Sequence, residues 1–140
     1  MILHQNSIIQ LNYNPATDIL DVKYPDLQRL FLSEIQESLK LMVETIRSYD
    51  VKNLLLDAST TRVELSDADN RNLTLHLAAE LSNTRLVKVA RIKPIDPIKE
   101  IKAQENILNL ERSRLLPYQL RTFSDRAEAL AWLTGNVKSF

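Results

Sequence analysis

The stretch of sequence that decides the fold is Lys52-Asn53-Leu54-Leu55-Leu56-Asp57-Ala58-Ser59. Its three consecutive leucines lie between a helical segment and a polar turn, and this apolar run is too short for a core helix. A strand buried on both faces explains the run best, because both sides of such a strand must be apolar. We therefore expect Leu54, Leu55 and Leu56 to form a central strand of a sheet covered by helices.

Two short segments rich in β-forming residues precede the leucine run. They are residues 8–13 and 19–24, and the turn-forming residues between them predict an antiparallel hairpin. A helix is predicted next, because Ser33 and Gln36 have the spacing of a capping box. The apolar positions that follow recur at helical spacing and predict a core-facing stripe. They are Ile35, Leu39, Met42, Ile46 and Tyr49.

Helices and strands alternate after the leucine run. Each later helix has a start signal, namely Ser66-Asp67, Asp96-Pro97 and Ser124-Asp125, and Gly135 is a stop signal for the last one. The predicted elements are a helix over residues 66–81, a strand over 86–92, a helix over 98–114, a strand over 120–123 and a helix over 124–134.

The resulting order of elements, ββαβαβαβα, predicts an α/β fold with a mixed sheet. The later strands are expected to be mostly parallel and joined by right-handed crossovers. A chain of 140 residues is long enough to bury one core without disulfides or a structural metal. We therefore expect residues 1–140 to form a single domain.

The composition argues against several classes of partner. Lysine plus arginine and aspartate plus glutamate both number 18, and no long block of one sign occurs, which disfavours nucleic acid and anionic membranes. The absence of cysteine excludes thiol nucleophiles, cysteine zinc sites and disulfides. No apolar run approaches the roughly 20 residues of a membrane span, and the first residues do not have the pattern of a secretory signal. We expect a cytoplasmic protein.

Cofactors are not expected either. Phosphate-binding loops need glycines that let the backbone approach the anion, and Gly135 is the only glycine in the chain. His4 and His76 have no partner at the spacing of a zinc site. The sequence therefore predicts no nucleotide cofactor and no metal ion.

The candidate site lies where the leucine strand ends. In open α/β sheets, the carboxyl ends of the strands are the usual position for ligands and modifications. We expect an exposed site for interaction or modification here, and Arg91 and Lys93 at the end of the next strand are candidate contacts for an anion beside it. The residues of this region are Asp57, Ser59, Thr60, Thr61, Ser66 and Asp67.

Three segments resemble the STAS-like, SpoIIAA-like proteins of bacteria. They are residues 12–20 (NYNPATDIL), 53–57 (NLLLD) and 120–133 (LRTFSDRAEALAWL). The resemblance implies a STAS-like fold and a non-enzymatic regulatory or protein-interaction module of the anti-sigma-factor-antagonist type. In such antagonists, a partner kinase phosphorylates a serine or threonine just after the central strand. This chain has Asp57-Ala58-Ser59-Thr60 there, in place of the usual Asp-Ser-Ser-Gly signature.

Two other functions remain open at this point. SpoIIAA-like folds also resemble lipid-binding carrier domains, and the apolar helix faces would then line a cavity for a small apolar ligand. An enzyme would use Asp57 as a general base, with its pKa raised by burial, together with the neighbouring hydroxyls. We expect no enzyme, because no catalytic set can be assembled from spacing. The expected partner is another protein or a second copy of the chain.

Overall fold

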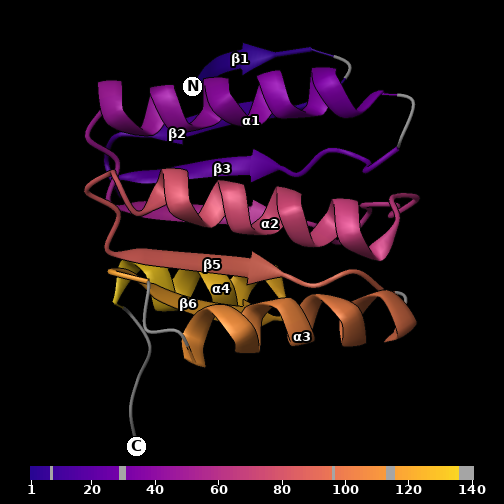
Figure 1. The fold of residues 1–140 in the computed structure, drawn as a ribbon. Helices are drawn as coiled ribbons and strands as arrows, with labels where there is room; N and C mark the ends of the chain where they lie inside the picture. The colour runs from indigo at the N-terminus through magenta and orange to yellow at the C-terminus, as the bar shows by residue number, and fades with distance from the viewer. Residues whose placement is uncertain (7, 29–30, 96, 113–115, 136–140) are drawn as a thin grey trace, which may run out of the picture.

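A mixed sheet with helices on both faces forms the structure, a computed structural model that describes residues 1–6, 8–28, 31–95, 97–112 and 116–135 (Figure 1). Within these residues the sheet has six strands, and four helices cover it. The strands are β1 (Ile2–Gln5), β2 (Gln10–Asn14), β3 (Ile19–Lys23), β4 (Asn53–Asp57), β5 (Lys88–Ile92) and β6 (Gln119–Phe123). The helices are α1 (Leu32–Ser48), α2 (Asp67–Leu81), α3 (Pro97–Arg112) and α4 (Arg126–Thr134).

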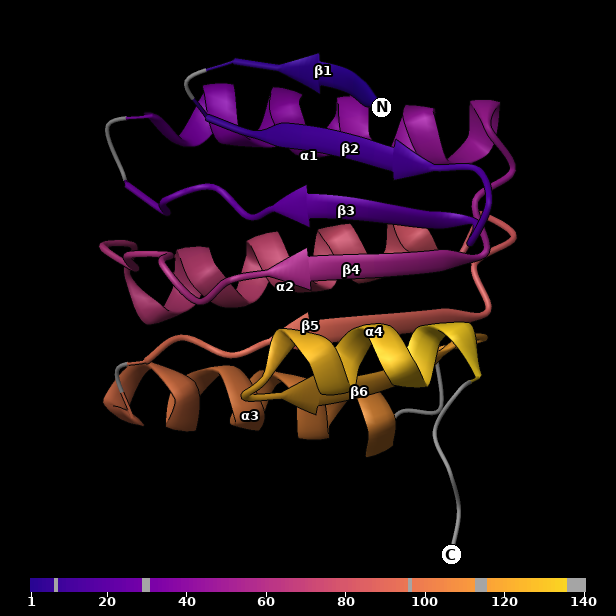
Figure 2. The same ribbon diagram turned by 180° about the vertical axis from the view of Figure 1, so that it is seen from behind.

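The strands follow one another across the sheet in sequence order, from β1 to β6. β1, β2 and β3 are antiparallel, whereas β3, β4, β5 and β6 are parallel. Helices α1, α2 and α3 lie on one face of the sheet, and α4 lies alone on the other face, over β5 and β6 (Figures 1 and 2). The prediction of a mixed sheet with parallel later strands is confirmed.

The leucine run is the centre of the sheet, as predicted. Leu54 and Leu55 have no exposed surface and Leu56 is 8% exposed. Because side chains alternate along a strand, Leu54 and Leu56 belong to the larger core beneath α1 and α2, and Leu55 belongs to a smaller core beneath α4. β4 therefore joins the two cores, which explains why its sequence is apolar on both faces.

The N-terminal hairpin is confirmed by the pairing of β2 with β3, but the sheet continues one strand beyond it. β1 pairs with β2 in antiparallel orientation, and its register shifts between Ile2 and His4. The element order is therefore βββαβαβαβα, with one strand more than predicted. The four residues of β1 show no alternation of apolar and polar side chains, so its strand conformation depends on the pairing with β2.

The start of α1 differs from the prediction. The helix begins at Leu32, Phe31 is its N-terminal cap residue, and no side chain caps it by a hydrogen bond. Ser33 is already inside the helix, so the predicted capping box is wrong. The predicted stripe is buried except for Tyr49, which is 48% exposed. The ring of Tyr49 lies outside the core with its centre 5.7 Å from that of Tyr13.

The other predicted helix signals agree with the structure where it describes them. The hydroxyl oxygen of Ser66 caps α2 by accepting from the backbone N–H of Asp69 at 3.1 Å. Asp125 caps α4, and Gly135 ends it with a left-handed φ of 74°, which glycine adopts without steric cost. Asp96, the predicted cap of α3, lies outside the described residues, as do the predicted last residues of that helix, 113–114.

An aromatic pair fixes α4 to the edge of the sheet at β6. The ring centres of Phe123 and Trp132 are 5.6 Å apart. The guanidinium of Arg121, also on β6, lies 5.5 Å from the centre of the Phe123 ring.

Within the part of the chain that the structure describes, no helix has both the length and the apolar character needed to span a membrane.

Candidate functional site

Asp57, the first predicted site residue, holds structural elements together. Its Oδ1 accepts from the backbone N–H of Ser59 at 3.0 Å and from the Ser59 hydroxyl at 2.6 Å. Its Oδ2 lies 3.4 Å from Nη1 of Arg126, the first residue of α4. Arg126 also forms an ion pair with Asp21 on β3. Asp57 therefore fixes the turn after β4 and the start of α4.

The turn after β4 is only partly exposed. Thr60 is exposed, but Thr61 is 7% exposed and its hydroxyl donates to the backbone carbonyl of Tyr24 at 3.3 Å. A parallel bridge between Leu27 and Val63 holds this part of the turn against the chain that follows β3. The expectation of an exposed turn is therefore wrong for Thr61, because a second chain segment covers it.

The remaining residues of the predicted region lie further from the strand. Ser66 and Asp67 are both exposed at the start of α2, where Ser66 acts as the helix cap. Lys93 is exposed just beyond the end of β5. The predicted region is therefore spread along the turn and does not converge on one point.

The structure does not bring Arg91 together with Asp57. In the parallel pairing of β4 with β5, Leu56 aligns with Arg91 and Asp57 aligns with Ile92. Aligned residues of neighbouring strands point to the same face. Arg91 is therefore on the face covered by α1, α2 and α3, whereas Asp57 is on the face of α4.

Arg91 forms a bidentate ion pair with Glu100 of α3. Nη2 of Arg91 donates to Oε1 of Glu100 at 2.6 Å, and Nη1 donates to Oε2 at 3.1 Å. Nε2 of Gln104 also donates to this Oε2, at 2.7 Å. Burial alone would raise the pKa of Glu100, but hydrogen bonds from Arg91 and Gln104 and the charges of Arg91 and Lys93 outweigh it, so the pKa is lowered. Glu100 is therefore a carboxylate at neutral pH.

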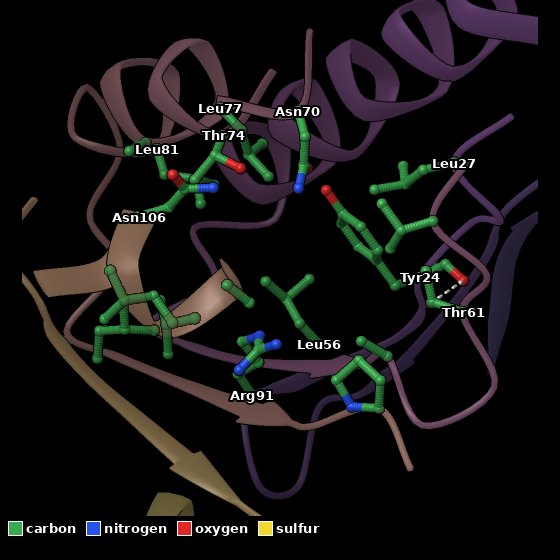
Figure 3. Close-up of a pocket in the computed structure, with 18 of the residues that line it drawn as sticks. Tyr24, Leu27, Leu56, Thr61, Asn70, Thr74, Leu77, Leu81, Arg91 and Asn106 are labelled. Atoms are coloured by element: carbon green, nitrogen blue, oxygen red, sulfur yellow. Dashed lines mark hydrogen bonds between the residues drawn. The ribbon is translucent and has the colours of Figure 1, made fainter. Parts of the chain in front are cut away.

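A cavity of about 140 Å³ lies beside this ion pair, between α2 and α3 and above β5 (Figure 3). Most of its lining is apolar. Leu56 and Val89 line it from the sheet, Leu77 and Ala78 from α2, and Ile107 from α3. The cavity is partly open, so a small molecule has a path to it from solvent.

Polar side chains lie around the apolar part of the cavity. Asn70 and Thr74 of α2, Asn106 of α3 and the hydroxyl of Tyr24 line its helix side, opposite Leu56 (Figure 3). Within the described residues these side-chain groups have no hydrogen-bond partner, and none of them is completely enclosed. They are therefore available to a ligand inside the cavity.

The Tyr24 hydroxyl is a hydrogen-bond donor at neutral pH. Burial raises the pKa of Tyr24 to about 12, although the nearby positive charge of Arg91 acts in the opposite direction. A phenol with this pKa stays protonated, and it can both donate and accept a hydrogen bond. The cavity therefore offers neutral donors and acceptors, from the hydroxyls and amides, against an apolar lining.

Tyr24, Asn70, Thr74 and Asn106 were not predicted as site residues from the sequence. A signal for Asn70 and Thr74 was present, because they lie eight and four residues before the buried Ala78 and so share its helix face. Polar residues in line with a buried stripe either reach solvent or border a cavity. Asn106 has no comparable signal, because the buried Ile107 is its immediate neighbour and adjacent residues do not share a helix face.

Comparisons of this chain with known protein families, with curated proteins and with solved structures gave no match. The resemblance to STAS-like proteins stays a prediction.

Among the described residues, no group of three or more His, Cys, Asp or Glu side chains is arranged to hold a metal ion.

Proposed function

We propose that the protein binds a small, mainly apolar molecule in the cavity between α2 and α3. The observation that carries this proposal is the combination of an apolar lining with the polar groups of Tyr24, Asn70, Thr74 and Asn106, which have no hydrogen-bond partner among the described residues. Ligand sites in proteins typically combine apolar walls with a few polar groups that fix the orientation of the ligand. This proposal takes up the small-ligand carrier that the sequence left open as an alternative.

The size of the cavity indicates the size of the ligand. Its volume of about 140 Å³ is close to the roughly 150 Å³ of an apolar cavity that accommodates benzene. Pockets for drug-sized molecules are larger, at about 300 to 1,000 Å³. The volume therefore supports a ligand of about one ring with a polar group, and does not favour a long-chain lipid.

Filling the cavity is expected to weaken ligand binding. Ala78 is buried and lines the cavity, so Ala78→Phe places a ring in the space that the ligand would use. We expect the dissociation constant for a neutral single-ring probe, such as benzamide or phenol, to rise by at least about 10-fold, which corresponds to about 1.4 kcal/mol. Protein-observed NMR titration measures this change.

The matched control is Ala79→Phe, which adds the same ring at the exposed neighbouring position of α2. It is expected to leave probe binding unchanged. Thermal unfolding of both variants establishes that they are folded. The proposal fails if no neutral single-ring probe shifts the amide resonances of the cavity residues, or if Ala78→Phe binds as tightly as the unaltered protein.

A regulatory protein-interaction module is the second candidate, supported by the exposed hydroxyl residue Thr60 at the carboxyl end of β4. The STAS-like resemblance favours a switch residue at this position. Ser59 and Thr61 are less suited, because their hydroxyls donate to Asp57 and to the Tyr24 carbonyl. The contacts of Asp57 with Ser59 and Arg126 give no support to the enzyme alternative.

A charge at position 60 is expected to weaken partner capture. Thr60→Asp should reduce the amount of a specific partner recovered from native lysate, and the uncharged Thr60→Asn should not, because a charge opposes burial in a neutral interface. Both variants should change the free energy of unfolding by no more than about 0.5 kcal/mol, since the residue is exposed. Equal capture by the two variants would argue against a charge-sensitive interface at this turn.

A further inference from the structure

We propose that Glu100 sets the charge preference of the cavity, so that the ligand is a neutral molecule of about one ring carrying an amide or hydroxyl group. This inference rests on the proposed ligand-binding function and adds the chemical class of the ligand. It is based on the ion pair that neutralises Arg91, the only cationic side chain among the described residues that line the cavity.

Arg91 is the only charged side chain among the described residues that line the cavity. Figure 3 shows its guanidinium on the sheet side, near Leu56. An unpaired arginine in this position would attract a carboxylate or phosphate, because its planar group binds such anions in a bidentate manner. Glu100 already occupies that position, with contacts of 2.6 and 3.1 Å.

The Arg91–Glu100 ion pair is held in place by burial and by a third side chain. The side chains of Arg91 and Glu100 are 13% and 14% exposed, and Gln104 holds the second oxygen of Glu100 at 2.7 Å. Salt screens a mostly buried pair only weakly. An anionic ligand must therefore displace Glu100 or lie next to its carboxylate, and like charges brought together at an interface are unfavourable.

The other polar groups of the cavity suit a neutral ligand. The amides of Asn70 and Asn106 each carry donors and an acceptor, and the hydroxyls of Tyr24 and Thr74 do both. A ligand amide or hydroxyl can therefore pair with these groups without bringing a charge into the cavity. Glu100 does not touch the ligand in this arrangement; it acts through Arg91 as a specificity-determining residue.

The test uses three probes of nearly the same shape, namely benzamide, benzoate and benzamidinium, titrated by protein-observed NMR. The unaltered protein is expected to bind benzamide most tightly, and benzoate at least about 10-fold more weakly, because Glu100 already holds the Arg91 guanidinium. Glu100→Gln removes the negative charge and leaves Arg91 unneutralised. This variant is expected to bind benzoate about 10-fold more tightly than the unaltered protein does, with the affinity for benzamide nearly unchanged.

The matched control is Glu105→Gln, which removes the same charge from an exposed position of α3 and should leave the preference as it was. The inference is overturned if the unaltered protein binds benzoate as tightly as benzamide, or if a folded Glu100→Gln variant keeps the original ratio. If Glu100→Gln does not fold, the affinities of the unaltered protein for benzamide, benzoate and benzamidinium test the inference, and benzamide must bind most tightly. Absence of binding by every neutral single-ring probe would instead refute the proposed function itself.

Discussion

Replacing Leu55 by alanine is expected to lower the free energy of unfolding by about 2 to 5 kcal/mol, as for other large-to-small changes in a core. Leu55 has no exposed surface and packs in the smaller core with Ala129 and Leu133 of α4. The side chain loses its apolar contacts, and it leaves a cavity behind. The neighbouring residues cannot easily close this cavity, because the interior is tightly packed.

The control for this prediction is Val87→Ala, a loss of apolar volume at a position that is 49% exposed. It should change the free energy of unfolding by no more than about 0.5 kcal/mol. Urea unfolding, followed by circular dichroism, measures both variants. A Leu55→Ala variant as stable as Val87→Ala would show that β4 is not the buried centre of the sheet.

Removing one partner of the Arg91–Glu100 ion pair is expected to cause the second large loss in the free energy of unfolding. Arg91→Leu should destabilise the protein by roughly 3 kcal/mol, because Glu100 is then left mostly buried without its bidentate partner. The double variant, Arg91→Leu with Glu100→Leu, should recover most of that loss, since an apolar pair avoids the cost of burying charges. Equal stability of the single and double variants would contradict this account.

The same ion pair makes stability depend on pH in a defined direction. The pKa of Glu100 is lowered in the folded protein from its ordinary value of 4.5. A carboxyl with a depressed folded pKa contributes stability that is fully present above its unfolded pKa and is lost as the pH falls through the folded pKa. The stability difference between the unaltered protein and Arg91→Leu should therefore shrink as the pH falls below about 4.5.

The architecture was predictable because its signals are local. Three leucines in a row between two turn-forming segments favour a doubly buried strand, and Ser66, Asp125 and Gly135 mark helix ends by their own backbone chemistry. β1 escaped prediction because its strand conformation depends on a neighbour, β2, and not on its own pattern. Ser33 gave a wrong prediction, because a serine with the correct spacing caps a helix only when the helix begins just after it, and α1 begins before Ser33.

The candidate site was less predictable because it depends on packing between elements distant in the sequence. The carboxyl edge of the parallel strands was a useful guide to Thr61 and Arg91, which both line the cavity. The space itself exists because α2 and α3 do not fill the surface above β5. That depends on the volumes of side chains from both helices and from three strands, which no local pattern contains.

The two edges of the sheet have a consequence for aggregation. A long, flat and apolar edge strand is a template on which another molecule can add a strand, and short, irregular or charged edges prevent this. β1 has only four residues and a shifted register, and β6 carries Arg121. Each end of the sheet thus has a feature that opposes strand addition and amyloid-like growth. These edges therefore favour docking of a second copy of the chain through side chains on a face of the molecule over pairing at a sheet edge.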